Sequence, residues 1–315
     1  MKERPSLFHG VGWPVIKVRA KHVCEYVILR LFTGVMRVLP YKISLSIGWV
    51  IAWLSFFVFS FRRKAAESRI HSVFSHRFSQ RETRRIAWLS WRNFVFAAVD
   101  MMRIPTITLD WAKAHVSGYE EPRQVLLDQC RTGKGAVIVC PHMGSWELAG
   151  VIGQLIDIPI FFITGRQKNP LVDRYLNRLR GSTGLTTVQR GSSLLKNVLK
   201  KLRNSDVLAI MPDVRAPAKE ITVRFLGSEA NVPAGIGLFS RQAGVPIVPL
   251  IMLRSGWSHH VFRACKLIYP DDQVDKHEDW RRMTQEIFGV IEKAIMETPE
   301  QWFWFNKRWI LDPIE

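Results

Sequence analysis

Cysteine is scarce in this chain, and the familiar cysteine patterns are missing. Only four cysteines occur in 315 residues, at positions 24, 130, 140 and 265. They form no C-x-x-C pair and no recognisable disulfide framework, which indicates a reducing compartment and no structural zinc site. We therefore expect no metal in this protein.

Several catalytic signatures are also absent. The sequence contains no G-x-S-x-G elbow, no phosphate-binding P-loop, no G-x-G-x-x-G and no H-E-x-x-H. Their absence disfavours a serine hydrolase, a nucleotide hydrolase, a dinucleotide-dependent enzyme and a zinc protease. Residues 1–21 are basic and lack the apolar run and small-residue cleavage site of a signal peptide.

Acidic residues are few relative to basic ones. There are 45 Lys and Arg residues against 27 Asp and Glu, giving a formal net charge of +18. Such a chain attracts polyanions. Twelve Trp and eighteen Phe, many beside basic residues, favour an anionic membrane surface over a nucleic-acid groove. No RNA-binding, zinc-finger or basic-zipper signature is present, so no nucleic acid is expected as a partner.

The N-terminal part of the chain contains two apolar segments. Residues 22–38 predict an amphipathic helix with a basic side, suited either to the plane of a membrane or to ordinary packing. Residues 43–61 carry no charge over 19 positions. At 1.5 Å per residue such a helix would be about 28 Å long, close to a bilayer core of about 30 Å. It would span the membrane once, lie half-immersed, or pack under the globular domain.

The rest of the chain alternates between helical and strand patterns. Residues 62–102 predict basic helices with a break near Ser79, and residues 122–133 predict another helix. Predicted strands cover residues 136–140, 158–164, 186–189, 207–211, 221–226, 247–253 and 261–268; predicted helices cover residues 170–180, 192–203, 233–243 and 279–297. This alternation predicts an α/β fold with a largely parallel or mixed central sheet and helices on both faces. We divide the chain into membrane-associating helices at 1–61 and an α/β domain at 62–315.

The stretch AVIVCPHMGSWELAG, residues 136–150, combines a buried strand with polar groups at its end. On one helix His142 and Glu147 would point roughly 140° apart, but with His142 on a loop they can meet. Ser145 is a candidate N-cap, and Gly144 would let a substrate approach the backbone. An ionised Glu147 would orient the imidazole of His142 and leave its other nitrogen free as a base. The alternatives are a chance His/Glu pair, or Cys140 as a nucleophile.

Six segments agree in order with a known family. They are PHMGSWELAG, ITGRQKNPLVDRYLNRLR, QRG, AIMPDVR, VRFLGSEANVPAGIGLFSRQAGVPIVP and TPEQWFWFNKRW. Together, over roughly residues 22–311, they resemble the bacterial lipid A late acyltransferases, which include the lauroyl and myristoyl acyltransferases. The segments also resemble the related phosphatidylinositol mannoside acyltransferases, and this family is a branch of the lysophospholipid acyltransferase superfamily. The resemblance implies an αβα sandwich like that of glycerol-3-phosphate acyltransferase, preceded by membrane-associated helices.

The same resemblance implies a reaction and its participants. A fatty acyl chain would pass from a thioester to a lipid hydroxyl, with no acyl-enzyme and no cofactor. His142 would act as the base and Glu147 would hold its tautomer. The donor would be a thioester of acyl carrier protein or coenzyme A, and the acceptor a phosphorylated lipid of lipid A or related glycolipid biosynthesis. The site would lie at the cytoplasmic face of a bacterial inner membrane, on a peripheral or single-span protein.

The resemblance also implies several substrate-binding residues. Arg166, assisted by Lys168 and Asn169, would clamp a phosphate, unless this run is a solvated basic turn. Arg190 matches a family Arg-Gly step, and Asp213 an acidic position in the groove.

Where the family often has Asp-Gln, this chain has Asp213, Val214 and Arg215, so Arg215 would contact the acceptor differently. The aromatic C-terminal segment would form an interface belt or pack on the sheet. A competing hypothesis from another class is a non-catalytic basic protein that binds membrane surfaces, in which His142 is structural.

Overall fold

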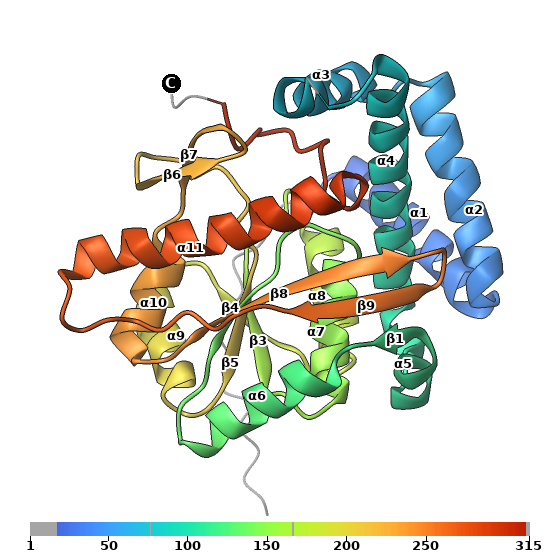
Figure 1. Cartoon of the computed structure of the whole chain (residues 1–315). Helices are drawn as coiled ribbons and strands as arrows, with labels where there is room; N and C mark the ends of the chain where they lie inside the picture. Colours follow the sequence, from blue (N-terminus) through green and yellow to red (C-terminus); the bar gives the residue numbers. More distant parts are fainter. Residues whose placement is uncertain (1–17, 76, 166, 313–315) are drawn as a thin grey trace, which may run out of the picture.

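A computed structural model describes residues 18–75, 77–165 and 167–312 (Figure 1). A seven-stranded sheet has the order β1-β9-β8-β2-β5-β3-β4. Its neighbours are parallel except for β8 and β9, which are antiparallel. The predicted α/β class with a mixed central sheet is therefore confirmed.

The strands are β1 (Val116–Ser117), β2 (Val137–Val139), β3 (Ile160–Thr164), β4 (Thr186–Gln189), β5 (Val207–Ile210), β6 (Ile221–Phe225), β7 (Ser228–Val232), β8 (Ile247–Ser255) and β9 (His259–Ala264). The α-helices are α1 (Ala20–Val38), α2 (Tyr41–Trp53), α3 (Arg63–Phe74), α4 (Gln80–Arg103), α5 (Leu109–His115), α6 (Glu120–Arg131), α7 (Trp146–Leu155), α8 (Pro170–Gly181), α9 (Leu194–Leu202), α10 (Gly235–Ala243) and α11 (Lys276–Glu297). A π-helical turn, η1 (Leu54–Val58), extends α2, and 3₁₀ turns form η2 (Ile104–Thr106) and η3 (Pro299–Gln301).

Helices cover both faces of the sheet, because successive side chains of a single strand join two different core clusters. In β2, Val137 and Val139 join one core cluster, which includes α10 and α11. Ile138 joins a second cluster, with residues of α6 and α7. A strand rotates successive side chains to opposite faces, so an unbroken apolar run is buried on both sides.

The sequence placed most elements within a few residues, and it missed three. The short helix α5, the edge strand β1 and the strand β7 were not predicted. Strand β7 pairs with β6 in a separate antiparallel hairpin. The predicted break near Ser79 is confirmed, because the Ser79 hydroxyl and the Glu82 carboxylate form a reciprocal capping box at the start of α4.

The N-terminal helices α1 and α2 lie beside α4 at one side of the molecule (Figure 1). One side of α2 is buried through Tyr41, Ser44, Leu45, Gly48 and Ala52. In the described residues, sixteen of the twenty exposed large hydrophobic side chains fall within positions 18–61. The predicted helix at 22–38 is confirmed by α1.

The C-terminal segment crosses back to the sheet. Trp302, Trp304 and Trp309 are 2%, 0% and 7% exposed, and the Trp302 ring packs against Phe225 and Trp304. Of the two alternatives for this segment, packing on the domain is the one observed. Its tryptophans form no interface belt, since their apolar area is already removed from water.

Candidate active site

The loop after β2 carries the first predicted site residue, His142. Gly144 has φ +56°, and a Cβ there would lie 2.3 Å from the Met252 carbonyl oxygen. The Gly144 amide donates to the carbonyl of Gln301 at 3.0 Å. Glycine is thus needed here for the close approach of β8. The predicted role of Gly144 in the approach of a substrate stays a prediction.

His142 pairs with Asp213, which follows β5. The Nδ1 atom of His142 lies 2.8 Å from Asp213 Oδ1, and the His142 amide donates to Oδ2 at 2.9 Å. Trp302 Nε1 donates to the same Oδ2 at 2.7 Å. Strands β2 and β5 are neighbours in the sheet, so their carboxyl ends bring these two residues together.

The electrostatics of the pair follow from this contact. Burial raises the pKa of Asp213, but His142 and the hydrogen bonds from His142 and Trp302 outweigh burial and hold that pKa below its ordinary value. Burial lowers the pKa of His142, yet the carboxylates of Asp213 and, to a lesser extent, Glu147 hold it above the ordinary value. The carboxylate fixes the proton on Nδ1, which leaves the Nε2 lone pair available to accept a proton.

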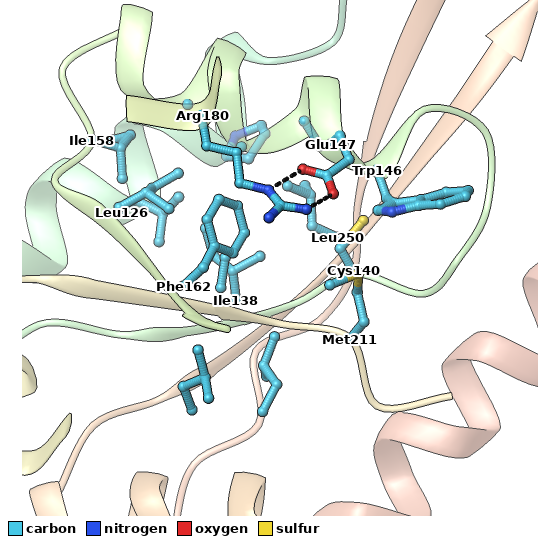
Figure 2. Close-up of a pocket in the computed structure, with 18 of the residues that line it drawn as sticks. Leu126, Ile138, Cys140, Trp146, Glu147, Ile158, Phe162, Arg180, Met211 and Leu250 are labelled. Carbon is cyan, nitrogen blue, oxygen red and sulfur yellow. Dashed lines mark hydrogen bonds and ion pairs between the residues drawn. The ribbon is translucent and has the colours of Figure 1, made fainter. Parts of the chain in front are cut away.

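The predicted contact between His142 and Glu147 is wrong. Glu147 instead binds Arg180 of α8 in a bidentate pair, with Arg180 Nε 3.0 Å from Oε2 and Nη2 2.5 Å from Oε1 (Figure 2). The two side chains are 15% and 18% exposed. A fork-shaped guanidinium is a better bidentate partner for a carboxylate than an imidazole is, so Arg180 takes both oxygens.

A long apolar cavity borders this ion pair. It encloses about 1090 Å³ of space, including solvent at its mouth. Lining residues extend along α7 from Trp146 to Ile156, which follows the last residue of the helix, over about 15 Å at 1.5 Å per residue. Leu126, Ile138, Ile158, Phe162 and Leu250 surround the space, and Glu147 and Arg180 lie together at one side (Figure 2). The cavity matches an extended hydrocarbon chain better than a compact polar ligand.

Two small residues of α7 make room for this packing. A Cβ on Gly150 would lie 2.3 Å from the Phe162 ring, and one on Gly153 would lie 2.3 Å from Cδ1 of Ile160. Cys140 also lines the cavity, where burial, followed by Asp213, raises its pKa to about 12. A thiol with this pKa stays protonated at neutral pH, which removes Cys140 as a nucleophile.

The remaining predicted binding residues are scattered. Asn169 caps α8, accepting from the amides of Leu171 and Val172, and its amide donates to Glu25 and the His22 carbonyl of α1. Asn169 is only 7% exposed and these contacts engage its side chain in the fold, so its assistance in substrate binding stays a prediction. Lys168 and Arg190 are exposed and Arg215 is half-buried, and all three stay predictions. Arg166 lies outside the described residues.

A second polar cluster, which the sequence did not predict, lies beneath the loop. Asp100 of α4 accepts hydrogen bonds from Tyr41 and Ser145, each at 2.7 Å, and pairs with Arg254 of β8. Ser145 does stand at the N-cap position of α7, but its side chain makes no capping hydrogen bond, and its hydroxyl donates to Asp100. An Asp within an apolar helical stretch was the available signal, since buried carboxylates need partners.

The described residues contain no group of three or more His, Cys, Asp or Glu side chains arranged to hold a metal ion. The polar groups around the loop and the cavity are the imidazole of His142, the carboxylates of Asp213 and Glu147, and the guanidinium of Arg180.

Comparisons with known proteins find relatives that are acyltransferases. The chain is 24% identical over 187 residues to a phosphatidylinositol mannoside acyltransferase of Mycolicibacterium smegmatis, covering 57% of this chain and 58% of that protein. It is 22% identical over 188 residues to the enzyme of the same name from Mycobacterium tuberculosis, covering 57% and 56%. The chain thus matches less than two thirds of the length of these relatives. The family model for bacterial lipid A biosynthesis acyltransferases matches residues 17–310, so this chain belongs to that family.

Proposed function

We propose that this protein is a membrane-associated O-acyltransferase that moves a fatty acyl chain from a thioester to a hydroxyl of a lipid acceptor. The observation that carries the proposal is the His142–Asp213 pair, because the His142 ring lies 5.0 Å from the ring of Trp146, and Trp146 lines the apolar cavity of about 1090 Å³, solvent at its mouth included. The pair supplies a base, and the cavity supplies a place for the chain.

In this mechanism Nε2 of His142 takes the proton of the acceptor hydroxyl as its oxygen attacks the thioester carbonyl. The tetrahedral intermediate collapses, the C–S bond breaks, and the proton passes to the departing thiolate. Asp213 holds the required tautomer through Nδ1 and stabilises the imidazolium that forms. A positioned base of this kind contributes about 10²–10⁴ in rate. No covalent acyl-enzyme and no cofactor are needed.

Glu147 has a different role from the one the spacing suggested. Its bidentate contact fixes Arg180 at the side of the cavity nearest Trp146, whose ring lies 5.0 Å from that of His142. We assign the pair to binding at the cavity entrance, where Nη1 of Arg180, which Glu147 does not bind, offers hydrogen bonds to a polar or phosphorylated substrate group. A phosphorylated lipid acceptor and an acidic donor, either acyl carrier protein or coenzyme A, suit the net charge of +18.

Membrane association is assigned to α1 and α2. Residues Tyr41–Val58 are long and apolar enough to cross a bilayer by length and composition alone. However, α2 packs one side on α4 and exposes Ile43, Val50, Ile51 and Trp53 on the rest of its surface. A one-sided apolar surface fits a helix lying in the interface, so we assign the protein to peripheral attachment at the cytoplasmic face of the bacterial inner membrane.

The proposal is tested by measuring thiol release from acyl carrier protein and coenzyme A thioesters of several chain lengths. The reaction is run in detergent with phosphorylated glycolipids and lysophospholipids as acceptors. Acceptor-dependent release that is lost in His142→Ala supports the proposal. His71→Ala, which removes an exposed histidine of α3, is the matched control and is expected to keep full activity. Equal activity in the two variants would eliminate His142 as the base. Absence of release with every donor would favour a non-catalytic membrane-binding protein.

A further inference from the structure

The buried cluster around Asp100 lies directly under the catalytic loop. We propose that Asp100 and Arg254 are positioning residues, which hold the start of α7 through Ser145 and so fix His142 relative to Glu147 and Arg180. The proposal rests on the proposed acyl transfer for its kinetic consequence, but its structural part can be tested without any reaction.

The contacts converge on one carboxylate. Tyr41 donates to Asp100 Oδ1 at 2.7 Å, and Ser145 donates to Oδ2 at 2.7 Å. A terminal guanidinium nitrogen of Arg254 binds the same Oδ2, and its other terminal nitrogen donates to the Trp257 carbonyl at 2.7 Å. Four elements that are far apart in sequence therefore meet here: α2, α4, the start of α7 and the end of β8.

Because these side chains are buried, the loss of any one contact is energetically costly. Asp100 is 1% exposed and Arg254 is 4% exposed, while Ser145 is fully buried. A buried charge without partners is strongly unfavourable, so Asp100 keeps this geometry as long as its partners stay in place. The Ser145 side chain makes no N-cap bond to α7, so its one side-chain hydrogen bond is the one to Asp100. The cluster, and not local side-chain capping, therefore contacts the start of α7.

A second set of bonds ties the same strand end to the loop. The side chain of Gln301 accepts from the Arg254 amide at 3.0 Å and donates to the Arg254 carbonyl at 3.0 Å. The Gln301 carbonyl accepts from the Gly144 amide, and the Phe303 amide donates to the His142 carbonyl at 3.1 Å. The loop is thus held on its backbone by one segment and on the Ser145 side chain by Asp100. Losing the side-chain tie leaves the first turn of α7 less constrained.

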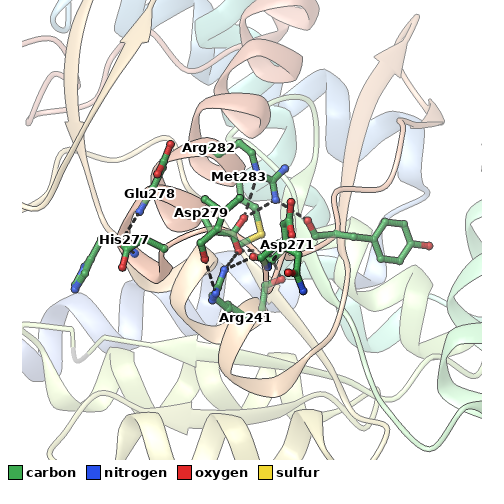
Figure 3. A network of polar contacts seen from close by, with 12 residues as sticks. Arg241, Asp271, His277, Glu278, Asp279, Arg282 and Met283 are labelled. Atoms are coloured by element: carbon green, nitrogen blue, oxygen red, sulfur yellow. Dashed lines mark hydrogen bonds and ion pairs between the residues drawn. The ribbon is translucent and has the colours of Figure 1, made fainter.

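The chain offers a matched control in another buried ion-pair cluster. Asp279 of α11 is fully buried and binds Arg241 and Arg282, in a network that joins α10, α11 and the loop around Asp271 (Figure 3). It has the same chemistry, and its residues contact neither the loop at 142–147 nor the described cavity. Asp279→Asn therefore reports the effect of weakening a buried ion pair as such.

The experiment compares Ser145→Ala, Asp100→Asn and Asp279→Asn with the wild-type chain. Steady-state kinetics of acyl transfer, thermal unfolding and hydrogen exchange of the amides of residues 142–149 are measured on each. Ser145→Ala is expected to lower kcat about 10–100-fold with KM within about threefold, because a misplaced group near the reacting atoms costs up to about 10² in rate. Amide exchange at 145–149 is expected to accelerate. Asp279→Asn is expected to lower thermal stability and leave kcat and these amides unchanged.

The outcomes separate the two proposals. Unchanged kcat and unchanged exchange in Ser145→Ala would overturn the positioning role, even if Asp100→Asn fails to fold. A loss of kcat in Asp279→Asn as large as that in Ser145→Ala would also overturn it, because general destabilisation would then explain both. If the wild-type chain transfers no acyl group, the proposed function fails, and the exchange measurement alone still decides whether Ser145 and Asp100 hold the loop.

Discussion

Replacing Asp213 by Asn tests the central contact of the site with almost no change in volume. Three donors point at this carboxylate. The backbone amide of His142 and the indole Nε1 of Trp302 donate to Oδ2, and the Nδ1–H of the His142 ring donates to Oδ1. An asparagine offers one oxygen and one NH₂ group. If the oxygen keeps the two donors at the Oδ2 position, the NH₂ group faces Nδ1. Nδ1 must then accept, the proton moves to Nε2, and the base is lost.

The expected magnitude follows from the role of the base. Loss of a positioned base removes about 10²–10⁴ from kcat/KM, which is about 2.7–5.4 kcal/mol of transition-state stabilisation. The pH dependence changes as well. Asp213 holds the pKa of His142 above its ordinary value, so the acid limb of wild-type kcat/KM falls as the pH drops through that raised pKa. Without the carboxylate the pKa of His142 is lower. The acid limb of the residual kcat/KM of Asp213→Asn is therefore expected to move to lower pH than that of the wild type.

The assay is the thioester-release reaction across a pH range from about 5 to 9, which brackets the ordinary histidine pKa. Far-UV circular dichroism and thermal unfolding establish that the variant is folded, and Asp279→Asn serves as the control for weakening a buried carboxylate. A folded Asp213→Asn variant with wild-type kcat/KM would refute the assignment of Asp213. A reduced rate whose acid limb moves to higher pH would refute the electrostatic argument.

Three further predictions concern the loop, the cavity and the membrane surface. Gly144→Ala, with φ +56° and a Cβ 2.3 Å from the Met252 carbonyl oxygen, is expected to lower the free energy of unfolding by about 1–3 kcal/mol in urea titrations, and a wild-type midpoint would contradict this. Ile158→Trp fills part of the cavity and is expected to shift the preferred acyl donor to shorter chains, whereas an unchanged chain-length profile would argue that the chain binds elsewhere. Leu31→Ser and Phe59→Ser, at positions 67% and 75% exposed, are each expected to weaken binding to anionic vesicles by about 1.5–3 kcal/mol, and Leu195→Ser, at the exposed Leu195 of α9, is expected to leave sedimentation with vesicles unchanged.

Much of the fold could be predicted from local patterns. The strand at 136–140, the loop at His142 and a helix after the N-cap candidate Ser145 follow from an apolar run, the proline that ends it and the residue types beyond it, and all three are present as β2, the loop and α7. The short elements β1 and α5 escaped prediction because two to seven residues carry too little periodicity. The boundary at residue 61 stays a prediction.

The site was harder to predict because its contacts are non-local. His142 and Glu147 are close in sequence, and their spacing suggested a direct pair. In the structure His142 pairs with Asp213, 71 residues away, and Glu147 pairs with Arg180, 33 residues away. Asp213 was chosen only through the resemblance to the family, and Arg180 was not singled out.

The sequence by itself determined the secondary structure around His142, the placement of this residue at a strand end, the basic charge and the apolar N-terminal helices. Each of these depends on residue type and short-range spacing, which the chain carries wherever it folds. The tertiary structure alone decided which carboxylate orients His142, because strand order puts the end of β5 next to the end of β2. It also decided that Ser145 binds Asp100 and that Trp302 is buried, since a buried polar group takes the partner that packing brings within reach.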